Sequence, residues 1–218
     1  MTLSLFEEKL QLRRQMRRLR RHIPLRQRQQ AGMQLLKVAR RARLLRRGWD
    51  YAAYWPLPEE CPLLPLLHAL QARQARVWLP QLPPRGQRRL RFCAWQGTGH
   101  WRRKRFGLQE WQGRRFRGVQ ALRCVWVPLV AFDEQGHRLG MGGGFYDTTL
   151  APIVRRRVWA RPYRIGIAFD AQEVARVPCE AWDVALDGIL TPSRFIRCGY
   201  FGRAIVPRRV KDSECCGQ

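Results

Sequence analysis

A glycine-rich segment is the part of this chain whose residue types are best suited to chemistry. It reads Arg-Leu-Gly-Met-Gly-Gly-Gly-Phe-Tyr-Asp from Arg138 to Asp147 and is called the glycine loop below. Glycine adopts positive φ values readily and lets a ligand approach the backbone closely. The loop lies between an apolar strand and a predicted helix, so backbone N–H groups and the helix dipole would favour an anion. This pattern predicts a phosphate site, with a purely structural turn as the alternative.

Carboxylates accompany the loop in a chain that has few of them. Asp147 falls in the first turn of the predicted helix, where it could cap the helix or hold Mg²⁺ against phosphates. Asp183 and Asp187 follow Glu180 near the start of a predicted strand. This acidic cluster either belongs to a functional site or neutralises nearby arginines.

Two further patterns involve charge at a defined spacing. Lys9 and Arg13 are four residues apart and share a helix face, from which they could contact a phosphate or face solvent. Glu59 and Glu60 follow Trp55 closely. A carboxylate beside an aromatic ring suits a heterocycle with ring N–H donors, and a helix N-cap is the alternative.

The elements that must position these residues alternate between helix and strand. Spacing of apolar residues, prolines and glycines predicts helices and strands that give an α/β fold with a mostly parallel sheet. The predicted helices cover residues 5–22, 27–47, 61–74 and 145 onward, and the predicted strands cover 51–55, 77–80, 125–132, 165–169 and 185–190, with an irregular excursion over 81–118. We expect one domain over residues 1–200 and a basic, flexible tail over 201–218.

Composition adds a second hypothesis. The 218 residues include 42 Lys and Arg against 16 Asp and Glu, a net charge of +26. Such a surplus either attracts polyanions or reflects solvated surface arginines. Trp95, Trp101 and Trp111 alternate with arginines, which suits base stacking and favours a nucleic-acid-binding protein on an α/β scaffold as the alternative function.

No segment predicts a membrane span or a secretory leader. The longest apolar run, Cys124 to Phe132, has nine residues and is too short to cross a bilayer. We therefore expect a cytoplasmic protein without a membrane partner. Five cysteines stand in or beside apolar stretches and are expected to be buried thiols: Cys61, Cys93, Cys124, Cys179 and Cys198.

The motifs together resemble the 5-formyltetrahydrofolate cyclo-ligase family, also called 5,10-methenyltetrahydrofolate synthetases. The most specific match is the run from Val127 to Asp133 followed by the glycine loop. Other matching segments occur in the same order over residues 5–195: Lys9-x-x-x-Arg13, Tyr54-Trp55-Pro56 to Glu60, Phe106-Gly107-Leu108, and Val177-Pro178 to Thr191.

The resemblance implies a three-layer α/β/α sandwich with a mostly parallel central sheet. It implies a ligase that closes 5-formyltetrahydrofolate to 5,10-methenyltetrahydrofolate with ATP and Mg²⁺, through a phosphorylated formyl group, releasing ADP and phosphate. The substrate could carry a polyglutamate tail, RNA or polyanion contact would be incidental, and we expect a monomer.

The resemblance also assigns roles to residues. Arg138 and Asp147 would be catalytic, and Asp147 and Asp183 would bind Mg²⁺. Trp55, Glu60 and Phe106 would bind the folate. The residues implied in ATP binding are Lys9, Arg13, Arg138, Leu139, Gly140, Met141, Gly142, Gly143, Gly144, Phe145 and Tyr146.

This chain departs from the family pattern within the loop itself. Family members often carry Arg or Tyr at the position of Met141, and some carry Lys at Gly143. Thr148 replaces an Arg that is common after Asp147, and Trp111 stands where a Pro often follows Glu110. Met141 cannot contact a phosphate by charge, so another cation must, and Arg138 is the candidate that the loop sequence offers.

Overall fold

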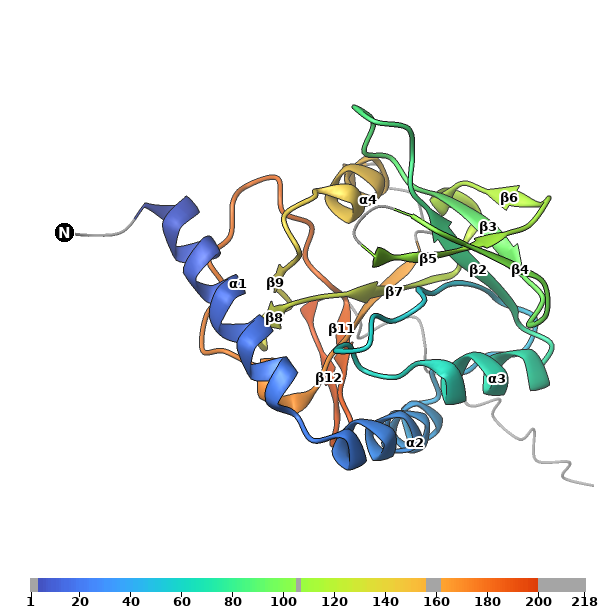
Figure 1. Cartoon of the computed structure of the whole chain (residues 1–218), viewed down its shortest axis with the longest axis horizontal. Helices are drawn as coiled ribbons and strands as arrows, with labels where there is room; N and C mark the ends of the chain where they lie inside the picture. Colours follow the sequence, from blue (N-terminus) through green and yellow to red (C-terminus); the bar gives the residue numbers. More distant parts are fainter. Residues whose placement is uncertain (1–3, 105–106, 156–161, 200–218) are drawn as a thin grey trace, which may run out of the picture.

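The structure is a computed structural model that describes residues 4–104, 107–155 and 162–199 (Figure 1). The helices are α1 (Leu5–His22), α2 (Leu25–Arg41), α3 (Leu64–Ala72) and α4 (Phe145–Arg155), with short 3-10 helices η2 (Val119–Ala121) and η3 (Asp170–Gln172). The strands are β1 (Asp50–Ala52), β2 (Arg76–Gln81), β3 (Arg91–Trp95), β4 (His100–Arg103), β5 (Gln109–Gln112), β6 (Phe116–Arg117), β7 (Cys124–Pro128), β8 (Ala131–Phe132), β9 (Arg138–Leu139), β10 (Tyr163–Ile167), β11 (Gly188–Leu190) and β12 (Phe195–Arg197).

The main sheet has eight strands in the order β12-β11-β10-β7-β1-β2-β3-β6. The five central strands, β11, β10, β7, β1 and β2, run parallel. The outer strands β12, β3 and β6 are antiparallel to their neighbours. The predicted α/β fold with a mostly parallel sheet is therefore confirmed.

Both faces of the sheet are covered by apolar residues. Alternate residues of β7 point to opposite faces: Trp126 packs with residues of α2 and α3, whereas Val125 and Val127 pack with Leu150 of α4. Figure 1 shows α2 and α3 on one side of the sheet and α4 on the other. Because both faces are buried, the central strands are nearly continuous apolar runs.

Connections leave β1 and β7 in opposite directions. From β1 the chain passes through α3 to β2 on one side, and from β7 it passes through α4 to β10 on the other. Ligands of open α/β sheets bind outside the carboxyl ends of strands where the connections diverge in this way. The segment after β1 contains Trp55 and Glu60, and the segment after β7 contains the glycine loop, so this edge positions the predicted site.

Helix α1 lies beside this edge. Ser4 and Glu7 form a capping box at its start, in which the Ser4 hydroxyl accepts from the Glu7 N–H and the Glu7 carboxylate accepts from the Ser4 N–H. Met16 is buried with Val130, which precedes β8, and with Leu139, which is the last residue of β9. The helix thus holds Lys9 and Arg13 near the glycine loop.

Several predicted boundaries were wrong. Helix α2 ends at Arg41 instead of continuing to Arg47, because Arg43 has a φ of 55° and Leu44 turns into the core. The predicted strand 125–132 is two strands, since β8 leaves the main sheet to pair with β9. The excursion after residue 81 contributes β3 and β6 to the main sheet and a β4–β5 hairpin. A further strand, β12, follows β11.

Within the described ranges, no helix is both long and apolar enough to cross a membrane. The predicted flexible tail, residues 201–218, lies outside the part of the chain that the structure describes.

Candidate active site

The glycine loop connects β9 to α4, as a phosphate-binding loop requires. Gly142 and Gly144 have φ values of 96° and 66°, which side chains other than glycine rarely adopt. Residues 141–143 are exposed, and Phe145 begins the helix directly after Gly144. The loop therefore presents backbone at a helix N-terminus, where N–H groups and the dipole favour an anion.

Arg138 and Asp147 form the two ends of the loop and contact each other. Nη2 of Arg138 donates to Oδ1 of Asp147 at 2.7 Å, and its Nη1 donates to the carbonyl of Val184. The same Asp147 oxygen accepts from the Val184 N–H at 3.2 Å. The Arg138 side chain is only 4% exposed. Its two terminal nitrogens are used to hold the Asp147 carboxylate next to the backbone of Val184.

Lys9 and Asp183 form the neighbouring polar group. Nζ of Lys9 donates to Asp183 Oδ2 and Glu180 Oε2, both at 2.7 Å. Asp183 Oδ2 also accepts from the Glu180 N–H. Burial disfavours the Lys9 ammonium, but the hydrogen bonds to the two carboxylates outweigh it and raise the pKa of Lys9. Lys9 is thus a buried, charged residue and does not face solvent.

Arg13 contacts the glycine loop directly. Its Nε donates to the carbonyl of Gly140 at 2.9 Å. Its Cζ lies 3.7 Å from the position that a β-carbon on Gly142 would occupy. Arg13 therefore holds the first half of the loop with one nitrogen and keeps the rest of its guanidinium beside the loop backbone.

The carboxylates of Asp147 and Asp183 fit a magnesium ion. Asp147 accepts a hydrogen bond from the N–H of Val184, the residue after Asp183, so the two aspartates are neighbours in the structure. Within the described ranges, Oδ2 of Asp147 and Oδ1 of Asp183 accept no hydrogen bond, and the side chains are 30% and 24% exposed. No group of three or more metal-binding side chains occurs among the described residues. Mg²⁺ commonly uses only one or two carboxylates together with phosphates and water.

A buried polar cluster follows β1. Glu60 is 8% exposed, and its Oε2 accepts from the Leu57 N–H. Burial raises the pKa of Glu60, while the Leu57 N–H and Arg20 oppose the rise. Nη1 of Arg20 lies 3.8 Å from Glu60 Oε1, and Nε and Nη2 of this buried arginine make no hydrogen bond with the described residues. Tyr146 of α4 also has a buried hydroxyl that finds no hydrogen-bond partner in the part of the chain that the structure describes.

Trp55 lies in an aromatic cluster. Its ring centroid is 4.3 Å from that of Trp101, which in turn is 5.3 Å from that of Trp111. Trp95 and Trp111 are buried, with 6% and 3% exposure. The prediction that Trp95 and Trp111 stack on bases was therefore wrong, and of the three tryptophans only Trp101 is partly exposed. Phe106 lies outside the described residues.

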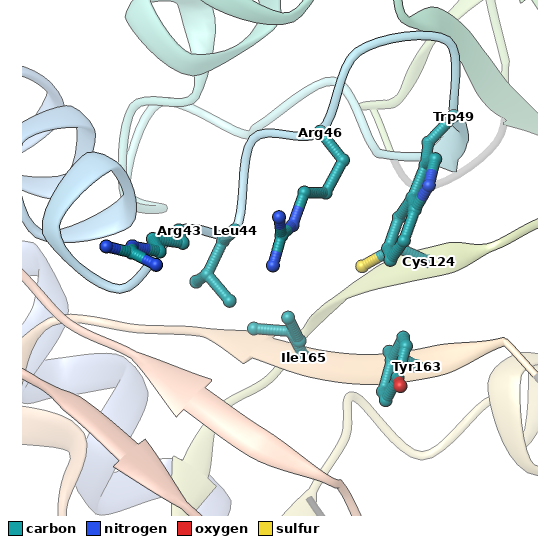
Figure 2. A pocket seen from close by; sticks show the side chains of 7 residues that line it. All are labelled: Arg43, Leu44, Arg46, Trp49, Cys124, Tyr163 and Ile165. Carbon is teal, nitrogen blue, oxygen red and sulfur yellow. The ribbon is translucent and has the colours of Figure 1, made fainter. Parts of the chain in front are cut away.

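A small cavity occurs at the other edge of the sheet (Figure 2). It is lined by Cys124, where β7 starts, and Tyr163, where β10 starts, with Arg43, Arg46 and Trp49 above them. Its volume of about 10 Å³ is room for about one water molecule, far below the range of about 300–1,000 Å³ typical of ligand pockets. The cavity is therefore distinct from the glycine loop and too small for a nucleotide.

Comparison with known proteins decides the family. A sequence model described as the 5-formyltetrahydrofolate cyclo-ligase family matches residues 6–192. The chain belongs to this family. The cyclo-ligase of Haemophilus influenzae is 30% identical over 84% of this chain and 97% of its own length. That of Escherichia coli K12 is 35% identical over 66% of this chain and 78% of its own length.

Solved structures of cyclo-ligases share the fold. The 5,10-methenyltetrahydrofolate synthetase of Aquifex aeolicus superposes with a TM-score of 0.73 at 23% identity, covering 93% of this chain and 98% of that one. The synthetase from Mycoplasma pneumoniae gives a TM-score of 0.66 at 22% identity, covering 84% and 98%. The chain is thus an enzyme of the cyclo-ligase type, as its sequence indicated.

The structure brings most residues predicted for this cyclo-ligase site to one edge of the sheet. Lys9, Arg13, Asp147 and Asp183 gather around the glycine loop through the contacts above. Glu60 did not prove to be a helix N-cap, because α3 starts after Leu63. Sequence reasoning missed Arg20, which resembles the exposed arginines on either side of it in the sequence and differs from them only by its burial.

Proposed function

We propose that this cyclo-ligase converts 5-formyltetrahydrofolate to 5,10-methenyltetrahydrofolate, using ATP and Mg²⁺ and releasing ADP and phosphate. The observation that carries the proposal is the junction of the glycine loop with Arg13, Lys9 and the two half-exposed carboxylates Asp147 and Asp183. Backbone N–H groups, cations and carboxylates with free oxygens are the groups that a metal–triphosphate complex needs.

The chemistry needs activation of a poor leaving group. The formyl oxygen attacks the γ-phosphorus, the bond to ADP breaks, and an imidate phosphate forms. The neighbouring folate N–H nitrogen then attacks the formyl carbon, the bond from this carbon to the phosphorylated oxygen breaks, and phosphate leaves while the nitrogen gives up its proton to phosphate or water. Mg²⁺ would neutralise charge on the transferring group, and the loop N–H groups would hold it in place.

Individual residues have separate tasks in this scheme. Asp147 and Asp183 would hold the metal, and Arg138 would act through Asp147 by fixing its carboxylate. Lys9 and Arg13 would bind phosphate oxygens. The other loop positions, Leu139 to Tyr146, would contribute mainly their backbone.

The folate would lie on the β1 side of this edge. Trp55 offers a ring face, and Glu60 offers a carboxylate that can accept from the N–H groups of a pterin. Phe106 remains a proposed lining residue. A polyglutamate tail on the substrate, a monomeric state and a cytoplasmic location also stay predictions.

The test is a purified-enzyme assay at the absorbance of the methenyl product. Product should form only with 5-formyltetrahydrofolate, ATP and Mg²⁺ together, and EDTA should abolish it. A folded protein that forms no ATP-dependent product would contradict the proposal. RNA binding that disappears at physiological salt would show that the net charge of +26 attracts polyanions without specificity.

A further inference from the structure

The glycine loop of this enzyme contributes no free cation from its own residues. Residues 139–149 contain no Lys, Arg or His. Arg138, the expected substitute for a charged residue at Met141, is 4% exposed and bound to Asp147 and the Val184 carbonyl. The loop must therefore obtain charge for a bound anion from other segments.

Two arginines from distant segments reach the loop, one at each half. Arg13 of α1 contacts the first half, at Gly140 and Gly142. Arg88 reaches the second half: its Nη1 lies 3.5 Å, and its Cδ 3.8 Å, from the position that a β-carbon on Gly144 would occupy. Gly144 immediately precedes α4, so the Arg88 guanidinium lies beside the N-terminus of that helix.

The segment that carries Arg88 is anchored to the site. The Leu90 N–H donates to Thr149 Oγ1 at 2.9 Å, and that hydroxyl donates to the Phe145 carbonyl in the first turn of α4. At its other end, the Leu82 N–H donates to Glu110 Oε2. These bonds fix the segment at both ends, so it holds Arg88 over the loop.

Arg88 is an exposed cation beside the N-terminus of a helix whose first turn has Asp147 as its acidic residue. A helix N-terminus carries partial positive charge and repels a cation. Residues 61–109 contain no Asp or Glu, and Arg88 makes no ion pair with any residue in the described ranges. An anion bound between Arg88 and the helix N-terminus would turn this repulsion into attraction on both sides.

We propose that Arg88 is a further binding residue for the triphosphate of ATP, supplying at the Gly144 end the charge that Met141 and Gly143 lack. This inference rests on the proposed function and deepens it by naming the residue. The carboxylates of the folate glutamate are the other anions that the enzyme would meet, and the experiment below separates the two.

The experiment compares Arg88→Ala with Arg91→Ala. The control removes the same charge from a neighbouring arginine whose guanidinium lies 4.9 Å from the centre of the Phe116 ring. Arg88→Ala should raise the KM for ATP about five- to ten-fold, the effect of one partly solvated charged hydrogen bond. The KM for 5-formyltetrahydrofolate should stay unchanged. Arg88→Lys should recover part of the affinity, and Arg91→Ala should match the wild type.

Direct binding separates this inference from the proposed function. Calorimetry with Mg·ATP and with AMP should show that Arg88→Ala weakens ATP binding and leaves AMP binding unchanged. An unchanged ATP affinity, or a rise only in the KM for the folate, would overturn the role of Arg88 while the cyclo-ligase activity stands. A wild type that binds ATP through Arg88 but forms no methenyl product would overturn the activity alone.

Discussion

Asp50 and Asp187 at one edge of the parallel sheet differ in hydrogen bonding and exposure from Asp147 and Asp183 at the other edge. At the amino ends of the strands, Asp187 accepts two side-chain bonds and one backbone bond from Arg164, at 2.6–2.9 Å, and its side chain is 7% exposed. Asp50, at the start of β1, likewise contacts Arg76, Arg117 and Trp78. At the carboxyl ends, Asp147 and Asp183 are 30% and 24% exposed and keep one oxygen free of hydrogen bonds from the described residues.

This difference in bonding and exposure distinguishes carboxylates that only stabilise the fold from carboxylates that could still bind a ligand. A buried, fully bonded carboxylate has no capacity left for a ligand, and removing it leaves its arginine buried without a partner. A half-exposed carboxylate held by one oxygen can still bind a metal with the other. Asp50 and Asp187 at the amino edge are thus held by several bonds, whereas Asp147 and Asp183 at the carboxyl edge are more exposed and keep an oxygen free.

The largest effect is expected at the amino edge. Asp187→Ala should lower the free energy of unfolding by about 3–5 kcal/mol, because Arg164 would remain buried and unpaired. Urea unfolding monitored by circular dichroism measures this. Asp183→Ala is the matched control and should cost less, about 1 kcal/mol, because Lys9 keeps its ion pair with Glu180. Equal losses in both variants would remove the distinction between the edges.

At the carboxyl edge the effect should appear in catalysis. Asp147→Asn should reduce kcat by about 10²–10³-fold, the usual loss when one preorganised charge contact to a transferring group is removed. The Asn amide oxygen can still accept from Arg138 and from the Val184 N–H, so its melting temperature should fall less than that of Asp187→Ala. Glu173→Gln, at an exposed ion pair with Arg194, should leave kcat unchanged. Wild-type activity of Asp147→Asn would take this carboxylate out of the metal site.

Buried and half-exposed thiols should differ in how they affect stability as pH changes. Burial raises the pKa of Cys61 and Cys124, and that of Cys198 to about 11. The unfolded chain loses these protons from about pH 8.5, whereas the folded chain keeps them. The unfolded state then binds fewer protons, so the free energy of unfolding should fall as pH rises above 8.5, by up to about 1.4 kcal/mol per pH unit for each such thiol.

Urea unfolding between pH 7.5 and 9.5 under reducing conditions measures this slope. Cys61→Ala/Cys124→Ala should flatten it. Cys179→Ala, at a half-exposed cysteine in the Asp183 segment, should leave it unchanged. A slope that is the same in the double variant and in wild type would show that the two buried thiols are not its source.

The smallest expected effect lies within the glycine loop. Gly142→Ala should cost about 1 kcal/mol in stability, because the backbone there has a φ of 96°. Gly140 has no positive φ and no neighbour within 4 Å of an added β-carbon, so Gly140→Ala should change stability by only a few tenths. Thermal melts of the two variants test whether the loop keeps this conformation.

Much of the site was predictable because its signals are local. Four glycines in five positions before a helix predict a phosphate loop or a structural turn from the local sequence, and the alternation of helices and strands indicated the parallel sheet. Boundaries were less predictable. Leu44 and Leu45 continue the apolar spacing of α2, yet the chain turns at Arg43 so that both enter the core.

Residue types and their order in the sequence by themselves determined the fold class and the family, and they predict an anion site after β7. Only the tertiary structure decided which charges lie beside the glycine loop. Forty-two basic residues look alike in the sequence, but burial and distance separate them: Arg138 is committed to Asp147, Arg20 is buried beside Glu60, and Arg13 and Arg88 reach the loop. The physical reason is that a charge acts according to its partners and its solvent exposure, and both arise from contacts between residues far apart in the chain.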